Sequence, residues 1–339
     1  MTPRQCVLDA FGHRRPARVP FTMYCDPEVE ERLNQHYGGP EWRQRLPPYI
    51  VTVSAVDTDR KERIDDSRVR DPYGGVWRID QRPWHLESPP LASPSFDGYR
   101  FPTPEQFCRP DWKEAARQTC AAQGKESFLV ASLGWGLFER SWNLRGFENI
   151  LADMVTDPEF VTDALDRLMN LYLAFVDYTA ELPVDAILFG DDWGDQRGVI
   201  VGPARWRHFF KPRWARIYQR VHEHGKLVLH HSCGSVAEIM PDLIEIGMDV
   251  LESCQPEAAG MQPDLLRRQW GGRMGFWGMI GSQRLLPFGT PAEITAEVRR
   301  LRREVAADGG VVLAPAKALQ PETPTANAVA LLEALTEAG

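Results

Sequence analysis

A short apolar segment of this 339-residue chain ends in two residues that could bind a metal. These are His231 and Cys233, and an imidazole nitrogen and a thiolate are the usual ligands of zinc in proteins. Cys254 ends the next apolar segment, so its thiol could reach the same point and leave one position of the metal open for chemistry. The alternatives are a hydrogen-bonded histidine beside a buried cysteine, and a buried apolar role for Cys254. The sequence therefore predicts a zinc site formed by His231, Cys233 and Cys254.

Charged residues at two further segment ends could act on a substrate. Asp191 and Asp192 follow an apolar run, and because side chains at a strand end alternate in direction, we expect one of the two to point into a pocket. That carboxylate could bind a hydroxyl or ammonium group, move a proton or complete a metal site; the alternative is a helix cap or a partner for Arg197. Lys317 could neutralise a carboxylate or phosphate, or act as an acid, unless it is an ordinary surface lysine. We predict Asp191, Asp192 and Lys317 as catalytic residues.

Polar and aromatic residues after other apolar runs are candidates for substrate binding. They share a position where the loops of an α/β fold meet. We predict substrate contacts from Tyr24, Trp135, Arg140, Trp193, Gln196, Gln255 and Gln283. The chain has 11 tryptophans, and those near segment ends indicate a flat apolar wall for an aromatic or macrocyclic ligand.

These candidates can act together only if the elements bring the segment ends to one face. Short apolar runs alternate with helical stretches and suit parallel strands that are buried on both faces. The predicted strands are Val19–Met23, Tyr49–Val56, Phe128–Ser132, Ala186–Phe189, Leu227–His230, Met248–Leu251, Met274–Trp277 and Val311–Ala314. Helix starts with a proline and a glutamate placed for a capping box stand at 156–159 and 290–293. The pattern predicts an α/β fold, a (β/α)₈ TIM-type barrel with its site at the C-terminal ends of the strands. An open doubly wound sheet is the alternative, but no Gly-rich phosphate loop follows the first strand.

One stretch, residues 59–100, interrupts the alternation of strands and helices. It contains Gly74-Gly75 between short β-prone runs and then several prolines, which predicts a β-hairpin followed by an extended tail. We find no internal repeat and no interdomain linker in the sequence. We therefore expect a single barrel domain over residues 1–339, with 59–100 as an insertion within it.

Composition limits the classes of partner. The formal net charge of -8 argues against a nucleic-acid binder. No apolar run approaches the length of a membrane span, and the first residues lack the pattern of a signal peptide. The six cysteines are scattered and form no disulfide framework. We expect a cytoplasmic protein that acts on a small molecule.

The second half of the chain resembles the uroporphyrinogen decarboxylase superfamily. The motifs that carry the resemblance are Gly-Asp-Asp-Trp-Gly-Asp-Gln (190–196), Leu-His-His-Ser-Cys-Gly-Ser-Val (229–236), Ile-Glu-Ile-Gly-Met-Asp-Val-Leu (244–251) and Ala-Pro-Ala-Lys-Ala-Leu-Gln (314–320). The N-terminal stretch 14–20 is similar to the start of such proteins, so the likeness covers nearly the whole chain apart from 59–100. The resemblance implies a (β/α)₈ barrel.

Within that superfamily the chain is more similar to the zinc-dependent methyltransferases of corrinoid pathways than to the true decarboxylases. True decarboxylases carry an early Arg-Gln-Ala-Gly-Arg run that binds substrate carboxylates, and this chain has no such run. The methyltransferases bind zinc with a His-x-Cys pair, matched here by His231 and Cys233, and with a later cysteine. Lys317 stands where that later cysteine is expected. Either Cys254 supplies the missing ligand, or the metal site is altered or lost.

The resemblance implies a methyltransferase-like enzyme that moves a methyl group between a small substrate and a corrinoid carried by a partner protein. Zinc would activate a thiol or an oxygen, and a homodimer is one option for the assembly. Two alternatives stay open. One is a metal-free decarboxylase or lyase in which Lys317 and Arg140 bind a substrate carboxylate, and the other is a non-catalytic accessory subunit.

Overall fold

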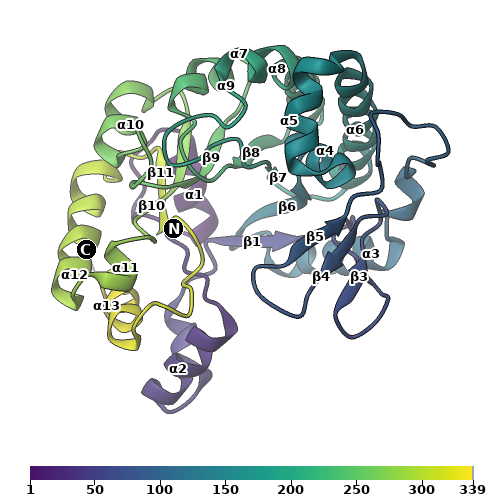
Figure 1. Cartoon of the computed structure of the whole chain (residues 1–339). Coiled ribbons are helices and arrows are strands. Elements are labelled where there is room, and N and C mark those ends of the chain that lie inside the picture. Colours follow the sequence, from purple (N-terminus) through teal and green to yellow (C-terminus); the bar gives the residue numbers. More distant parts are fainter. Residues whose placement is uncertain (338–339) are drawn as a thin grey trace.

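The computed structural model describes residues 1–337, and its centre is a curved parallel sheet. Seven strands follow one another in chain order across this sheet, so each connection returns to the neighbouring strand (Figure 1). The strands are β1 (Ile50–Val53), β6 (Phe128–Trp135), β7 (Ala186–Gly190), β8 (Leu227–His231), β9 (Val250–Cys254), β10 (Gly275–Ile280) and β11 (Val311–Pro315). Every residue of β10 and β11 is buried, as expected for strands covered on both faces.

The predicted first strand, Val19–Met23, is not formed as a strand. Phe21 makes an isolated parallel bridge to Leu313, and the backbone around it exchanges two hydrogen bonds with β11. The Phe21 ring packs edge-on against Tyr49, but within residues 1–337 no ladder joins this segment to β1. Pro20 has no N–H to donate, which shortens any pairing here. The expected closed eight-stranded barrel is therefore corrected to a curled seven-stranded sheet of TIM type that is not fully closed.

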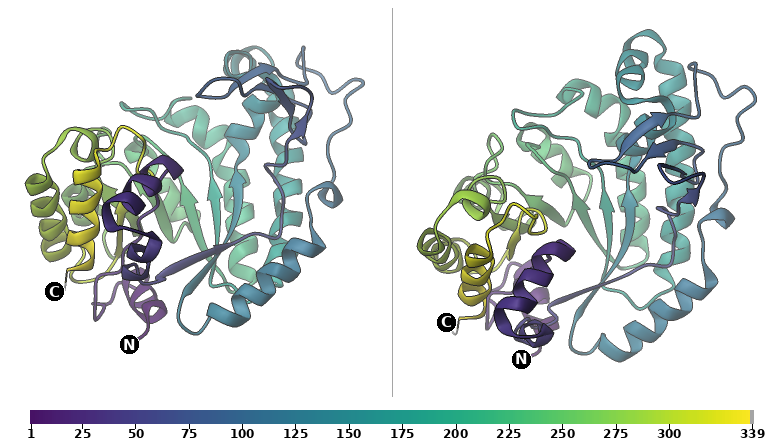
Figure 2. Two further views of the ribbon diagram at one scale, coloured as in Figure 1. Left: turned by 90° about the horizontal axis from the view of Figure 1, so that it is seen from below. Right: turned by 60° about the horizontal axis from the view of Figure 1, so that its bottom comes forward.

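Helices surround the outer side of the curved sheet (Figures 1 and 2). They are α1 (Pro3–Phe11), α2 (Pro27–Tyr37), α3 (Pro110–Gln123), α4 (Leu137–Arg145), α5 (Phe147–Thr156), α6 (Pro158–Ala180), α7 (Pro203–Phe209), α8 (Lys211–Glu223), α9 (Met240–Glu245), α10 (Pro263–Trp270), α11 (Leu285–Phe288), α12 (Pro291–Arg300) and α13 (Thr325–Thr336). Short helical turns are η1 (Pro40–Arg45), η2 (Pro104–Gln106), η3 (Ala237–Ile239) and the π-turn η4 (Leu301–Val305). None of the helices in the described part of the chain is long and apolar enough to cross a membrane.

The two expected helix starts have different caps. Thr290 and Glu293 form the capping box predicted for α12, with each side chain accepting a hydrogen bond from the other residue's backbone N–H. At the start of α6, the side chain of Asp157 makes no capping hydrogen bond. Both helices still begin at the predicted proline.

A separate antiparallel sheet lies beside α4 in the region of the expected hairpin (Figures 1 and 2). It has four strands, β2 (Glu62–Arg63), β3 (Arg68–Arg70), β4 (Val76–Arg78) and β5 (His85–Ser88), and is thus larger than one hairpin. The β3–β4 turn is held by Asp71, whose carboxylate accepts the N–H groups of Tyr73 and Gly75. The same carboxylate accepts a 2.8 Å hydrogen bond from Asn143 of α4, which fixes the small sheet to the main fold.

Candidate active site

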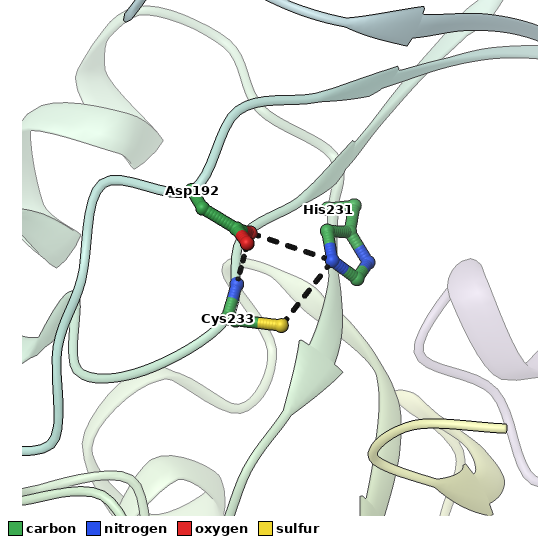
Figure 3. Close-up of side chains that lie close together, drawn as sticks. All are labelled: Asp192, His231 and Cys233. Atoms are coloured by element: carbon green, nitrogen blue, oxygen red, sulfur yellow. Dashed lines mark hydrogen bonds and ion pairs between the residues drawn. The ribbon is translucent and has the colours of Figure 1, made fainter. Parts of the chain in front are cut away.

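Three potential metal ligands meet where β7 and β8 end. The two strands pair in parallel with Gly190 opposite His231, so the residues that follow them lie at one edge of the sheet. The His231 Nε2 atom is 3.4 Å from Cys233 Sγ and 3.5 Å from Asp192 Oδ1 (Figure 3). All three ligand atoms lie within 4.8 Å of one another, and all three residues are half-buried. We call Asp192, His231 and Cys233 the donor cluster.

Glu252 of β9 orients the histidine of the donor cluster. It lies opposite His231 in the strand register, and its carboxylate contacts the Nδ1 atom of that ring. Because Nδ1 is engaged, Nε2 faces Cys233 and Asp192. Burial alone would lower the pKa of His231, but the Glu252 carboxylate and Cys233 raise it well above its usual value. Sequence reasoning missed Glu252, although an acid inside the apolar segment 250–254 was a visible signal.

The loops that carry the donor cluster touch each other through their backbones. A Cβ atom added to Gly194 would lie 2.6 Å from Ser235 N, and one added to Gly234 would lie 2.4 Å from the Gly194 oxygen. Gly234 also has a φ of 73°, which L side chains rarely adopt. The Ser235 N–H donates to Asp195 O at 2.7 Å across this contact. Only glycine fits at these two positions, and the close contact fixes one loop against the other.

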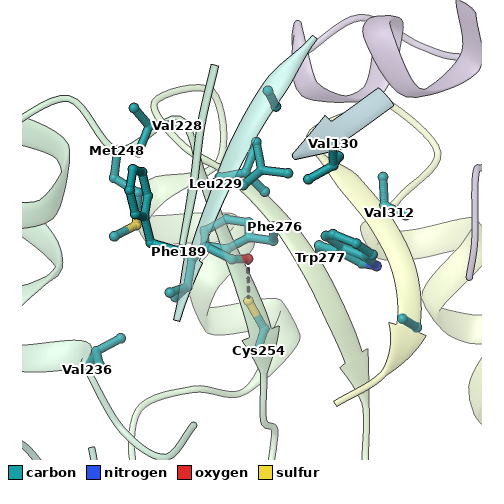
Figure 4. Packing of buried hydrophobic residues seen from close by; sticks show 14 of the residues in the cluster. Val130, Phe189, Val228, Leu229, Val236, Met248, Cys254, Phe276, Trp277 and Val312 are labelled. Atoms are coloured by element: carbon teal, nitrogen blue, oxygen red, sulfur yellow. Dashed lines mark hydrogen bonds between the residues drawn. The ribbon is translucent and has the colours of Figure 1, made fainter. Parts of the chain in front are cut away.

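Cys254 does not join the donor cluster, so its predicted role as a zinc ligand is corrected. Its side chain is 0% exposed among core residues, and its Sγ donates to the Leu251 carbonyl at 3.4 Å (Figure 4). Burial raises the pKa of this thiol, which disfavours a thiolate. The cause is a bulge: Glu252 pairs with Trp277 and Cys254 with the next residue, so Ser253 is extra.

Ser253 faces the donor cluster, although strict alternation along β9 would point it to the other side of the sheet. Its φ is 70°, and its hydroxyl oxygen lies 3.6 Å from Cys233 Sγ while donating to the Ala316 carbonyl at 2.6 Å. The bulge therefore presents both Glu252 and Ser253 to the donor cluster. It turns Cys254 into the core.

Asp191 points away from the donor cluster into a closed polar network. Its carboxylate accepts the backbone N–H groups of Phe138 and Glu139 at the start of α4, and the indole N–H groups of Trp193 and Trp214. It is fully buried, and burial raises its pKa to about 7 against the lowering effect of these donors. A sealed carboxylate that binds a helix N-terminus does not reach a substrate, so the catalytic assignment of Asp191 is corrected.

His230 belongs to the same network as Asp191. Its ring stacks on Trp193 at 4.3 Å, and its Nδ1 atom lies 2.6 Å from the Tyr218 hydroxyl. Burial lowers the pKa of His230 well below its usual value. Trp193 is 1% exposed, so the substrate contact predicted for it is corrected to a structural one. We call the set Asp191, Trp193, Trp214, Tyr218 and His230 the sealed network.

A cavity of about 630 Å³ adjoins the donor cluster and shares Asp192 with it. Glu139, which was not among the residues selected from the sequence, lines this cavity and is largely buried. Burial and the carboxylates of Asp191 and Asp192 raise the pKa of Glu139 to about 9. Trp135 lines a neighbouring cavity of about 480 Å³.

Arg140 is not available to bind a substrate carboxylate. It is 1% exposed, and its guanidinium donates to Asp59 at 3.0 Å and to the Thr58 carbonyl at 3.1 Å. The same group lies over the rings of Tyr73 and Trp135. We correct its assignment from substrate contact to a buried anchor of segment 58–59.

The remaining predicted residues differ in exposure. Tyr24 is half exposed, and burial of its hydroxyl together with the Glu252 carboxylate raises its pKa. The Gln255 side chain is buried and accepts the Gly234 N–H, so it supports a loop. The other three are exposed, and their catalytic or binding roles stay predictions: Gln196, Gln283 and Lys317.

Comparisons with known proteins agree with the family resemblance. The family described as Uroporphyrinogen decarboxylase (URO-D) matches residues 89–338. A Uroporphyrinogen decarboxylase from Streptomyces avermitilis is 28% identical over 107 residues, a stretch that spans 32% of this chain and 29% of that protein. The small antiparallel sheet, which ends at Ser88, lies before the family match.

A solved structure described as a methyltransferase from Methanosarcina mazei has the same fold. It superimposes with a TM-score of 0.72, covering 99% of this chain and 98% of that chain, at 20% sequence identity. The named relatives are thus a decarboxylase and a methyltransferase. At these identities the solved structure shows the fold, and the family match shows the family.

Proposed function

Because the chain belongs to the uroporphyrinogen decarboxylase (URO-D) family, we propose that it is a methyltransferase with zinc in the donor cluster. It would move a methyl group between a small substrate and a corrinoid carried by a partner protein. The observation that carries the proposal is the meeting of His231 Nε2, Cys233 Sγ and Asp192 Oδ1 at the strand ends.

The donor set fits zinc. Nitrogen, sulfur and carboxylate oxygen are its three common ligand types, and three protein ligands leave the fourth position open, as in catalytic zinc sites. Asp192 supplies the third ligand that the sequence assigned to Cys254. Bound there, zinc would lower the pKa of a substrate thiol or polarise a methyl-donor oxygen.

The chain's own residues prepare this site. Glu252 engages His231 Nδ1 and so directs Nε2 to the metal position, an arrangement typical of zinc-binding histidines. The Asp192 carboxylate accepts the Cys233 N–H at 2.8 Å, which holds the loop after β8 against the loop after β7. Glu139 and Asp192 both face the adjoining cavity, where the substrate would bind.

The family match is compatible with a decarboxylase, but the geometry gives the metal-free decarboxylase less support. That function needs cations to hold a carboxylate, and the guanidinium of Arg140 is already bound to Asp59. The described residues that line the adjoining cavity include no lysine or arginine. A cytoplasmic location fits the proposal, because a reducing compartment keeps a ligand thiol free.

Zinc content and methyl transfer test the proposal together. We expect about one zinc ion per chain in freshly purified protein, and thioether formation from methylcobalamin and a small thiol, measured by mass spectrometry. His231→Ala should abolish both, whereas Cys254→Ala, which changes only the core, should keep both. Zinc at background level in the native protein, or zinc that is unaffected by His231→Ala, would remove the metal from the proposal.

A further inference from the structure

The cavity beside the donor cluster has an aromatic wall. It lies between the small antiparallel sheet and the start of α4 and α5, and its aromatic residues are Trp77, Trp84, Phe138, Trp142 and Phe147. Trp84 and Phe147 are 50% and 45% exposed, which is unusual for such large apolar side chains. Exposed rings around a hollow of this size mark a ligand site more often than a packing surface.

Four of the five rings form one continuous wall, and Trp84 lines the same cavity. Trp142 lies 6.0 Å from Trp77 and 6.4 Å from Phe147, measured between ring centroids, and Phe147 lies 6.2 Å from Phe138. All these pairs meet edge to face. Such walls offer the electron-rich faces of several rings to one ligand.

Three acids and one histidine, His85, are the ionisable side chains among the lining residues, and the pKa of about 9 leaves Glu139 uncharged at neutral pH. Glu139 and Asp192 lie at the end nearest the donor cluster, and the exposed Glu148 lies at the start of α5. No lysine or arginine is among the lining residues that the structure describes. Lys61 approaches Trp77 at 5.8 Å, but it lines the neighbouring cavity of about 480 Å³. An anionic ligand would therefore find no lysine or arginine here, whereas a cationic one finds aromatic faces and the carboxylates of Asp192 and Glu148.

We infer that this cavity binds the alkylated ammonium group of a small cationic substrate. Aromatic walls next to carboxylates are the usual means of recognising such groups, because a methylated ammonium is large, weakly hydrated and unable to use simple ion pairing alone. The inference rests on the proposed function for the position of the reacting atom. With the ammonium among the rings, a thiol or oxygen elsewhere on the same molecule reaches Asp192, the residue shared with the donor cluster.

Binding of choline compared with its uncharged isostere, 3,3-dimethylbutan-1-ol, tests the inference. The two have the same shape and differ only in the charge, so calorimetry on metal-free protein isolates the cationic term. We expect choline to bind about 10-fold more tightly. Trp84→Ala should remove this preference, because it deletes an aromatic ring of the cavity. The ring is half exposed and is not part of the hydrophobic core, so the fold should be unaffected. Trp112→Ala, which removes an exposed ring on α3, is the matched control and should leave the preference intact.

Two results would overturn the inference. One is equal or undetectable binding of choline and its isostere at millimolar concentration. The other is tighter binding of an anionic methoxylated aromatic, such as 4-hydroxy-3-methoxybenzoate, in the same cavity. Because the measurement uses protein without metal, its failure leaves the zinc proposal standing, and a failure of zinc binding leaves this result valid.

Discussion

Two aspartates follow β7 and two histidines end β8. In each pair, one residue is structural and the other belongs to the donor cluster. Asp191 and His230 lie in the sealed network against α8 and α4, where every polar contact is made inside the protein. Asp192 and His231 lie in the donor cluster, half-buried and facing a cavity or a neighbouring ligand. The difference teaches that the side of the sheet, and not the residue type, decides which copy is structural.

The largest expected effect separates the two aspartates. Asp191→Asn places amide N–H groups against N–H donors, and should lower the free energy of unfolding by about 3 kcal/mol at pH 8. Asp192→Asn can still accept the Cys233 N–H and should change it by less than about 0.5 kcal/mol. Urea denaturation of both variants measures the difference. Equal losses of stability in the two variants would contradict the distinction between a structural Asp191 and a site-facing Asp192.

A smaller effect is expected at Glu252, which orients the histidine of the donor cluster. Glu252→Gln keeps a hydrogen-bond acceptor for His231 but removes the charge, and should weaken zinc binding roughly 10- to 100-fold. Competition with a chromogenic chelator measures the affinity. Glu322→Gln, a change at an exposed acid, is the control. Unchanged zinc affinity in Glu252→Gln would show that the histidine is oriented by something else.

The smallest effect tests whether the two regions are independent. Tyr218→Phe removes the hydroxyl that pairs with His230 and should lower the free energy of unfolding by about 1 kcal/mol. Zinc affinity should not change, because Tyr218 contacts only the sealed side of β8. Tyr178→Phe on α6 controls for loss of a hydroxyl. A drop in zinc affinity in Tyr218→Phe alone would show that the regions are coupled through the strand.

Most of the sheet could be predicted from apolar runs alone. The run Ala186–Phe189 became β7 and Leu227–His230 became β8, each with one more residue. Val19–Met23 is also mostly apolar but contains Pro20, and local composition cannot tell whether a partner strand is close enough to pair. The closure of the barrel depends on that distance between segments.

The candidate site was predicted in part, for a physical reason. The His231–Cys233 pair is local in sequence and needs only one strand end to bring it together. The position of the Cys254 side chain was predicted wrongly because the extra residue Ser253 reverses the direction of the next side chain. A serine in a strand does not by itself indicate a bulge. The sequence indicated an aromatic wall but not its position, because the cavity forms between the small sheet and α4, which are brought together by the Asp71–Asn143 contact.

The close approach of Gly194 and Gly234 has a consequence for the history of such a site. Part of the frame that positions the donor cluster is main chain, so it stays in place when the side chain at position 231 or 233 changes. Oxygen could replace sulfur, or sulfur oxygen, and shift the preference from one metal to another while the scaffold stays the same. A protein built in this way can exchange its chemistry one residue at a time without having to fold anew.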